Sequence, residues 1–242
     1  MIASAVFLPL FGSFLAGILV FIKIFDENKK TYLLIDRISQ YLTCLGLLIS
    51  AVLSILIFKD VALGGNEQTV QLFRWIDSGN LNISWALKVD TLTAVMMVVV
   101  TSVSSMVHIY SIGYMEKDPN IPRFMSYLSL FTFFMLMLVT ANNLLQMFFG
   151  WEGVGLASYL LIGFWYNKPS ANVAAIKAFV VNRVGDFGFA IGILLVYLVF
   201  DTINFDQIFS AVPQKTEENI SVFGGDFHAL TIACLFLFIG AM

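Results

Sequence analysis

Charged residues are scarce in this chain of 242 residues, making up 12% of it against 59% hydrophobic residues. Soluble domains carry about twice that share of charge, so the composition excludes a soluble globular protein and indicates a polytopic membrane protein. The 13 basic and 16 acidic residues leave a formal net charge of −3. That balance excludes the strongly basic surface that a nucleic-acid partner requires.

Cysteine is nearly absent. Cys44 and Cys234 lie in apolar runs, and no two cysteines have the spacing of a metal or redox motif. We therefore expect neither a disulfide nor a metal or iron–sulfur site, and we expect any redox cofactor to be held by other chains. The first apolar run, residues 1–22, also lacks a leading basic segment and a small-residue cleavage site. It predicts a first transmembrane helix and not a signal peptide.

Long apolar runs, by contrast, are abundant. Six of them are long enough to cross a hydrocarbon core roughly 30 Å thick, and they cover residues 1–22, 38–58, 90–113, 124–140, 143–166 and 171–200. A seventh run, 228–242, has only about 15 residues, so we expect the sequence to be an amino-terminal part of a longer protein. The predicted fold class is an all-α polytopic membrane protein with two domains, covering residues 1–123 and 124–242.

The connections between the predicted spans are polar. Residues 23–37 are rich in charge and are expected to form a loop and the start of a helix, and residues 201–226 are expected to form a loop. Within residues 59–88, apolar and polar residues alternate with a period of two on both sides of a turn-forming cluster at 77–80. This pattern predicts a β-hairpin outside the bilayer over about residues 69–88.

A lone two-stranded hairpin is only marginally stable in water. We therefore expect this hairpin to be pinned to the membrane face or to a neighbouring subunit, with Trp85 and Leu87 buried in that contact.

Glu152 is the only ionisable residue in the run 143–166. At 1.5 Å of rise per residue it lies about 14 Å along the helix, near the middle of the bilayer. A carboxylate there is costly unless it is paired, hydrated or protonated, so Glu152 marks an ion or proton site. The alternative is a hydrogen bond between helices that serves packing alone.

Three glycines flank this carboxylate, at positions 150, 153 and 155. A dinucleotide-binding motif would need a preceding strand and a solvated helix start, and the sequence has neither. We expect the glycines to allow close contact between helices and to leave room for water beside Glu152.

Arg183 and Asp186 lie three residues apart near the middle of the run 171–200, on adjacent parts of one helix face. Two charged side chains at that depth are too costly to face lipid. They either neutralise each other as a structural pair or join Glu152 in a group of three ionisable side chains.

Two further ionisable residues are weaker candidates. Lys177 lies nearer the end of its helix and is expected to snorkel to the membrane surface, with membership of the charged group as the alternative. His108 lies close to Tyr110 and Tyr114, which fit an interfacial aromatic belt. We expect a hydrogen-bonded interfacial histidine, and a proton relay is the less favoured alternative.

Three segments carry a family resemblance: HIYSIGYM at residues 108–115, the run 143–166 around GWEGVG, and KAFVVNRVGD at 177–186. They resemble the antiporter-like subunit of respiratory complex I, which is subunit L of NADH-quinone oxidoreductase in bacteria and subunit 5 in mitochondria. The resemblance implies a subunit at the distal end of the membrane arm that translocates protons while quinone is reduced elsewhere. Its hairpin would contact the adjacent subunit.

The resemblance also implies roles for individual residues. Glu152 matches the family's key glutamate, a proton carrier, and Arg183 and Asp186 match conserved charge partners. A lysine that partners the glutamate is expected just after Met242. When such a cation approaches a carboxylate in a low-dielectric site, the carboxyl releases its proton, and it takes the proton up again when the cation leaves.

The implied partners are the other membrane-arm subunits, the lipid bilayer and protons, with NADH, FMN, iron–sulfur clusters and quinone on other subunits. The implied location is the bacterial inner membrane, with the mitochondrial inner membrane as the alternative. Rival functions are a multisubunit sodium/proton antiporter, a membrane subunit of an energy-converting hydrogenase, and a structural membrane scaffold in which the three charges act only as interhelical contacts.

Basic residues predict the orientation, because they favour the cytoplasmic side. Seven alternating runs place Lys23, Lys29, Lys30, Arg37, Lys117, Arg123, Lys168 and Lys177 on one side and Lys59, Arg74, Lys88 and Lys215 on the other. We predict that a cysteine introduced at Asp77 reacts with an impermeant thiol reagent applied from outside the cytoplasm, and that one at Asp118 does not. The opposite labelling pattern would reverse the predicted orientation.

Overall fold

A computed structural model describes residues 1–25, 29–79, 81–215, 218–222 and 225–241. Within these ranges, six helices are long and apolar enough to cross a membrane: α1 (Ile2–Phe25), α2 (Lys29–Phe58), α3 (Thr91–Tyr114), α4 (Ile121–Val139), α5 (Leu144–Ile162) and α6 (Pro169–Phe200). The apolar helix α8 (Ala229–Ala241) has 13 residues and is too short to span. The prediction of six spans followed by a short seventh run is confirmed.

Local sequence signals set several helix ends. The side chains of Asp90 and Asn143 accept hydrogen bonds from backbone N–H groups in the first turns of α3 and α5, at 2.8 and 2.9 Å. Pro122 and Pro169 occupy the first turns of α4 and α6, where a missing N–H costs nothing.

A helix does start within the charged segment, as expected, but α2 begins at residue 29, nine residues before the predicted apolar span. Lys23 near the end of α1 donates to Asp36 Oδ1 at 2.5 Å. This pairing balances the two charges, and a helix can therefore carry them close to the apolar region. At its other end α2 runs into a short π-helical turn, Lys59–Leu63.

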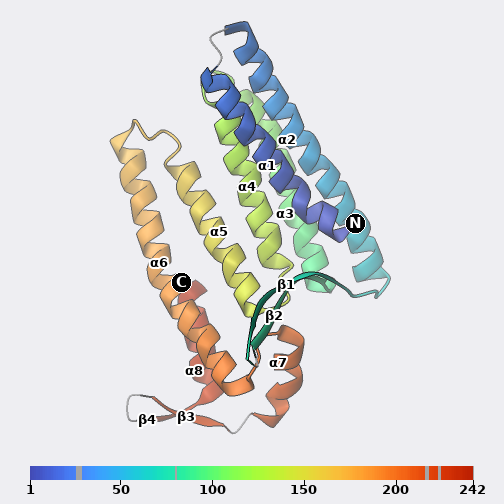
Figure 1. Cartoon of the computed structure of the whole chain (residues 1–242), viewed down its shortest axis with the longest axis vertical. Coiled ribbons are helices and arrows are strands. Elements are labelled where there is room, and N and C mark those ends of the chain that lie inside the picture. The colour runs from blue at the N-terminus through green and yellow to red at the C-terminus, as the bar shows by residue number, and fades with distance from the viewer. Residues whose placement is uncertain (26–28, 80, 216–217, 223–224, 242) are drawn as a thin grey trace.

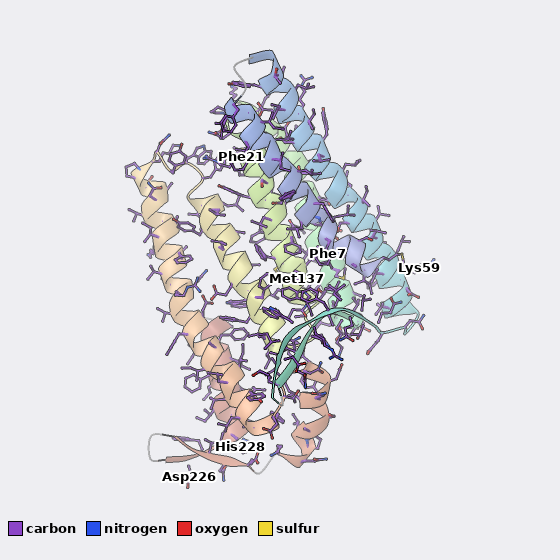
Figure 2. All side chains as sticks on the ribbon, in the orientation of Figure 1. Phe7, Phe21, Lys59, Met137, Asp226 and His228 are labelled. Carbon is purple, nitrogen blue, oxygen red and sulfur yellow. The ribbon has the colours of Figure 1, made fainter. Side chains whose placement is uncertain are left out.

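Figure 1 shows α1–α4 as a bundle, with α5 lying against α4, α6 against α5, and α8 behind α6. The hairpins and the short helix α7 (Phe205–Ala211) gather at one end of these helices, and the α5–α6 connection lies at the other. Near the hairpin end, Phe7 and Met137 lie beside each other (Figure 2) within a core cluster built from α1, α3, α4 and the hairpin. The proposed division of the chain at residues 123 and 124 stays a prediction.

The predicted hairpin is present. Strand β1 (Gln68–Ser78) pairs antiparallel with β2 (Leu81–Val89), and Gly79 in the turn has a φ of +59°, which glycine adopts at little cost. Asn80 of the predicted turn lies outside the described residues, as does Met242. Two register irregularities interrupt β1, between residues 71 and 73 and between 74 and 76.

The chain's own helices and turns hold one side of the hairpin, which the sequence did not predict, and the expected contact with the membrane face or another subunit stays a prediction. Leu87 is fully buried in the core cluster, whereas Trp85 is half-buried with its ring 4.8 Å from that of Phe149 on α5. Backbone pairing adds to this contact, because Lys88 N donates to Thr140 O at 2.9 Å. A hairpin that is marginal alone is thus stabilised by joining an existing core.

Residues 201–226 are not the plain loop that was expected. They contain α7, whose first turn is capped by the Asn204 side chain, a 3₁₀ turn (Val212–Gln214) and a second hairpin of β3 (Asn219–Val222) and β4 (Gly225–His228). Each element is too short to give a clear period in the sequence. His228, expected to open the seventh apolar run, is instead the last residue of β4.

Two of the three glycines lie against α4, as expected for close helix contact. A Cβ on Gly150 would stand 2.6 Å from the backbone nitrogen of Leu138, and one on Gly153 would stand 2.1 Å from the Phe134 ring. Gly155 differs, since its nearest neighbour would be Asn182 Nδ2 at 3.8 Å. Gly150 and Gly153 therefore allow α5 to approach α4 closely, whereas Gly155 faces α6.

This difference provides a matched pair of substitutions. We predict that Gly150→Ala destabilises the protein by about 2 kcal/mol or more, because the added methyl meets backbone that cannot move aside. Gly155→Ala, the same change five residues later on another face of α5, should leave the thermal midpoint nearly unchanged. Thermal unfolding of the purified variants in detergent measures both, and equal midpoints would contradict the proposed role of Gly150 in the α4–α5 contact.

Candidate functional site

Glu152 is the ninth of the 19 residues of α5, and it therefore lies at mid-helix as predicted. Its side chain is half-buried, with 24% of it exposed. The close contact of Gly150 and Gly153 with α4 directs the opposite side of α5, including Glu152, toward α6.

Arg183 on α6 connects two carboxylates. Its Nη1 forms an ion pair with Glu152 Oε1 on α5 and lies 3.6 Å from Asp186 Oδ2 on its own helix. The guanidinium also stacks over the Phe179 ring, 4.8 Å from its centroid. The structure thus brings the three predicted residues together, and Arg183 and Asp186 are not a pair separate from Glu152.

Asp186 is the most buried member of this group, with 7% of its side chain exposed. Its Oδ1 atom is buried and accepts no hydrogen bond from the part of the chain that the structure describes. A buried carboxylate oxygen without a donor is costly, so it calls for a water, a proton or a further cation.

A cavity of about 640 Å³ adjoins this carboxylate, between α4, α5, α6 and α8. Its walls are mostly apolar, and its polar lining includes Ser158, Asn182 and Asp186. Trp151 also lines it and packs against Phe189, with ring centroids 5.7 Å apart. The cavity gives the charged group room for water at mid-depth.

Ser158, Asn182 and Trp151 were missed as lining residues in the sequence. A signal existed for two of them, because Trp151 and Ser158 are seven residues apart and therefore share one helix face. Asn182 precedes Arg183 directly, and nothing in the sequence separates it from an ordinary polar residue.

His108 was expected as a hydrogen-bonded histidine near the membrane interface; its side chain is hydrogen-bonded, and its depth in the membrane stays a prediction. The side chain is fully buried between α3 and α4. Its Nδ1 lies 2.8 Å from Ser104 O, and its Nε2 lies 3.0 Å from Ser129 Oγ. The carbonyl can only accept, so Nδ1 is the donor and Nε2 accepts from the serine hydroxyl. The Ser129 hydroxyl on α4 provides a hydrogen bond that makes burial of the imidazole tolerable. Among the described residues, no hydrogen bond or ion pair joins His108 to Glu152.

Lys177 is exposed on α6 and forms no ion pair with any residue that the structure describes. It lies six residues, or about 9 Å of helix rise, before Arg183. The structure does not bring it into the group formed by Arg183, Glu152 and Asp186. Among the described residues there is also no group of three or more His, Cys, Asp or Glu side chains that could hold a metal ion.

Two family models match the chain. One is described as NADH-ubiquinone oxidoreductase (complex I), chain 5 N-terminus, and it matches residues 75–125. The other is described as NADH:quinone oxidoreductase/Mrp antiporter, TM, and it matches residues 141–242, which include the whole charged group.

Curated relatives agree with both models. NADH-ubiquinone oxidoreductase chain 5 of Chondrus crispus is 50% identical over 236 residues, which are 98% of this chain and 34% of the relative. NADH-quinone oxidoreductase subunit L of Rickettsia felis is 46% identical over 98% of this chain and 35% of its own length. The chain thus spans about a third of the length of these relatives.

Solved structures share the fold. The membrane-bound sulfane sulfur reductase, an archaeal respiratory membrane complex, contains a chain that matches with a TM-score of 0.75 at 17% identity, over 99% of this chain and 43% of that one. A chain of the Mrp complex from a Dietzia species matches with a TM-score of 0.71 at 18% identity, over 99% of this chain and 23% of that one.

The contacts of Arg183 predict a non-additive pair of substitutions. Arg183→Gln leaves the two carboxylates without their cation and should destabilise the protein by about 2–3 kcal/mol, below the range for a fully buried pair because half of Arg183 is exposed. Adding Asp186→Asn removes one of the two uncompensated carboxylates, returns the net charge of the group to the parent's −1 and should restore part of the lost stability. Lys177→Gln, on the same helix, is the control and should match the parent. Additive losses in the double variant would contradict the arrangement.

Proposed function

We propose, from the premise that this chain belongs to the antiporter-like family of complex I membrane subunits, that its α5–α6 charged group carries protons through the membrane arm of a proton-pumping NADH:quinone oxidoreductase. The observation that carries the proposal is the contact of one guanidinium, Arg183, with two carboxylates at mid-membrane. The activity belongs to the whole protein, and this chain spans about a third of the length of its relatives.

The charge count explains why this group suits proton transfer. With both carboxylates ionised, Glu152, Arg183 and Asp186 carry one net negative charge, and a single proton makes the group neutral. A net charge at mid-depth is expensive, whereas a neutral group is not. The group is therefore expected to take up and release one proton as its surroundings change.

Arg183 lies where it can bias that exchange. It forms its ion pair with Glu152 and lies 3.6 Å from Asp186, so a small displacement moves its charge from one carboxylate to the other. A cation this close stabilises the ionised form of a carboxylate, by less here than in a fully buried pair because half of the Arg183 side chain is exposed. Loss of the cation from Glu152 would favour protonation there, and its return would favour release.

The cavity beside Asp186 supplies a route for the proton. Ser158, Asn182 and the unpaired oxygen of Asp186 provide polar partners along an otherwise apolar wall. The chain's own part in the mechanism is thus to hold carboxylates at mid-depth, to place a cation between them and to keep a hydrated space beside them.

The comparisons favour complex I over the rival functions. Curated relatives named as complex I subunits reach 46–50% identity, whereas the Mrp and sulfane sulfur reductase chains share the fold at 17–18% identity. The proposed location is a multi-pass position in the bacterial or mitochondrial inner membrane, beside other membrane-arm subunits. NADH, FMN, iron–sulfur clusters and quinone are proposed to lie on other chains of the complex.

Substitution of Glu152 in the full-length protein tests the proposal. Glutamine can still accept a hydrogen bond from Arg183 but cannot exchange a proton, and Arg183 keeps Asp186 as a partner. We predict that Glu152→Gln assembles at near-normal levels and loses at least 80% of proton translocation, and that Glu152→Asp keeps part of it.

The measurement follows NADH oxidation and the proton gradient together in sealed vesicles. A packing role predicts the reverse order, with Gln nearly silent and Asp disruptive because its side chain is one methylene shorter. Full pumping by the Gln variant would end the case for Glu152 as a proton carrier.

A further inference from the structure

A second pocket, separate from the charged group, opens at the opposite end of α5 from the hairpins. It has a volume of about 350 Å³ and lies between the start of α4, the end of α5 and the start of α6. Its polar lining consists of one arginine, three tyrosines and an asparagine: Arg123, Tyr127, Tyr159, Tyr166 and Asn172. The helix ends that form it lie where the apolar spans meet water, at the level of lipid headgroups.

Arg123 is held in this pocket with part of its hydrogen-bonding capacity unused. Nη2 donates to Phe164 O at 3.0 Å, and the guanidinium lies 4.6 Å from the Phe164 ring and 5.2 Å from the Tyr166 ring. Its Nε is buried and has no hydrogen-bond partner in the described part of the chain. None of the described carboxylates forms an ion pair with it either.

An oriented guanidinium with a buried free donor and no carboxylate is suited to an anionic oxygen group. Arginine binds phosphate oxygens with two or more N–H donors, and stacking between rings fixes the plane in which they point. Tyr127 and Tyr159 add hydroxyl donors, since neither hydroxyl forms a hydrogen bond with the rest of the described chain and both residues line the pocket. The recognised chemistry is therefore a phosphate ester.

The surface next to the pocket decides in favour of a lipid as the source of that phosphate. Ile176 lines the pocket and is exposed, and it begins a stripe at helical spacing on α6 that continues through Val180, Val184 and Phe187, each more than half exposed. Acyl chains need such an apolar stripe leading away from a polar pocket, whereas free phosphate does not. Basic pockets between helices at the cytoplasmic surface are also where anionic lipids bind.

We propose that the Arg123 pocket is a binding site for the headgroup of an anionic phospholipid, whose acyl chains lie along the exposed α6 stripe. The site stands apart from the proton-translocation proposal, since neither Glu152 nor Arg183 contributes to it. Its two rings and the Phe164 carbonyl hold the arginine in place, so the free protein already has the binding geometry.

The test uses the intact protein, purified in detergent and stripped of lipid, with dioctanoyl phosphatidylglycerol and dioctanoyl phosphatidylcholine as probes. Native mass spectrometry measures binding of each. The expected result is at least tenfold tighter binding of phosphatidylglycerol, which Arg123→Gln reduces to the level of phosphatidylcholine. Lys117→Gln, which removes an exposed basic residue at the same membrane surface, is the matched control and should leave binding unchanged.

Three outcomes would overturn the proposal. Equal binding by the parent and Arg123→Gln would show that the pocket does not hold the headgroup, and an equal loss in Lys117→Gln would show general surface attraction. Competition by millimolar inorganic phosphate would assign the pocket to a free anion. If Arg123→Gln lowers only the yield of the assembled complex and the parent binds neither lipid, the pocket is a protein contact.

A second variant guards against a folding defect. Tyr127→Phe combined with Tyr159→Phe removes two hydroxyls and keeps both rings, so folding should be preserved. We expect this double variant to bind phosphatidylglycerol several-fold more weakly than the parent. Unchanged binding in it, together with an Arg123→Gln protein that does not fold, would also count against the proposal.

Discussion

The arrangement of the second half of this molecule depends on the ion pair between Glu152 and Arg183. A carboxylate at the middle of a membrane helix is costly unless it is paired, hydrated or protonated, and α6 supplies a partner for Glu152. The pair requires α5 and α6 to meet at one rotation and one height. Gly150 and Gly153 meet the same requirement from the other side, because their contact with α4 fixes which face of α5 is left for α6.

The hairpin contributes to this positioning through the start of α5. Asn143 Nδ2 donates to Ser84 O on β2 at 2.9 Å, and Gln146 Oε1 accepts from Ala86 N at 3.1 Å. Both side chains lie within the first turn of α5, six to nine residues before Glu152, or about 9–14 Å of helix rise. The structure outside the apolar region thus sets the height of the buried carboxylate. The hairpin and the turn before α5 therefore help to position the helix that carries Glu152.

The apolar spans could be predicted from the sequence because 18 or more consecutive apolar residues have few alternatives, and the period of two was enough for the first hairpin. Glu152, Arg183 and Asp186 could be selected because the cost of charge in a membrane is a local property of each position. The contacts that hold the hairpin and the burial of His108 could not be predicted in this way, because they depend on residues distant in sequence, such as Thr140 and Ser129. The short elements between residues 204 and 228 had too few residues to show a period.

The three charged side chains form one group only when α5 and α6 pack together, so neither segment alone reveals the arrangement. Arg183 and Asp186 are neighbours on one helix, and their spacing left open whether they form a complete pair or join Glu152. The position of α5 makes Glu152 the closer partner of Arg183 and leaves an oxygen of Asp186 without a donor beside a cavity. In the proposed function, this unequal number of carboxylates and cations is what allows the group to take up and release a proton.

The central claim is that Glu152 changes its protonation during turnover, and redox-triggered difference infrared spectroscopy of the intact complex tests it most directly. A protonated carboxyl has a C=O stretch that is separate from the bands of ionised carboxylates and of the backbone. The account predicts a carboxyl band that appears and disappears with turnover, is lost in Glu152→Gln and persists in Lys177→Gln. The same band at full intensity in both variants would contradict the account.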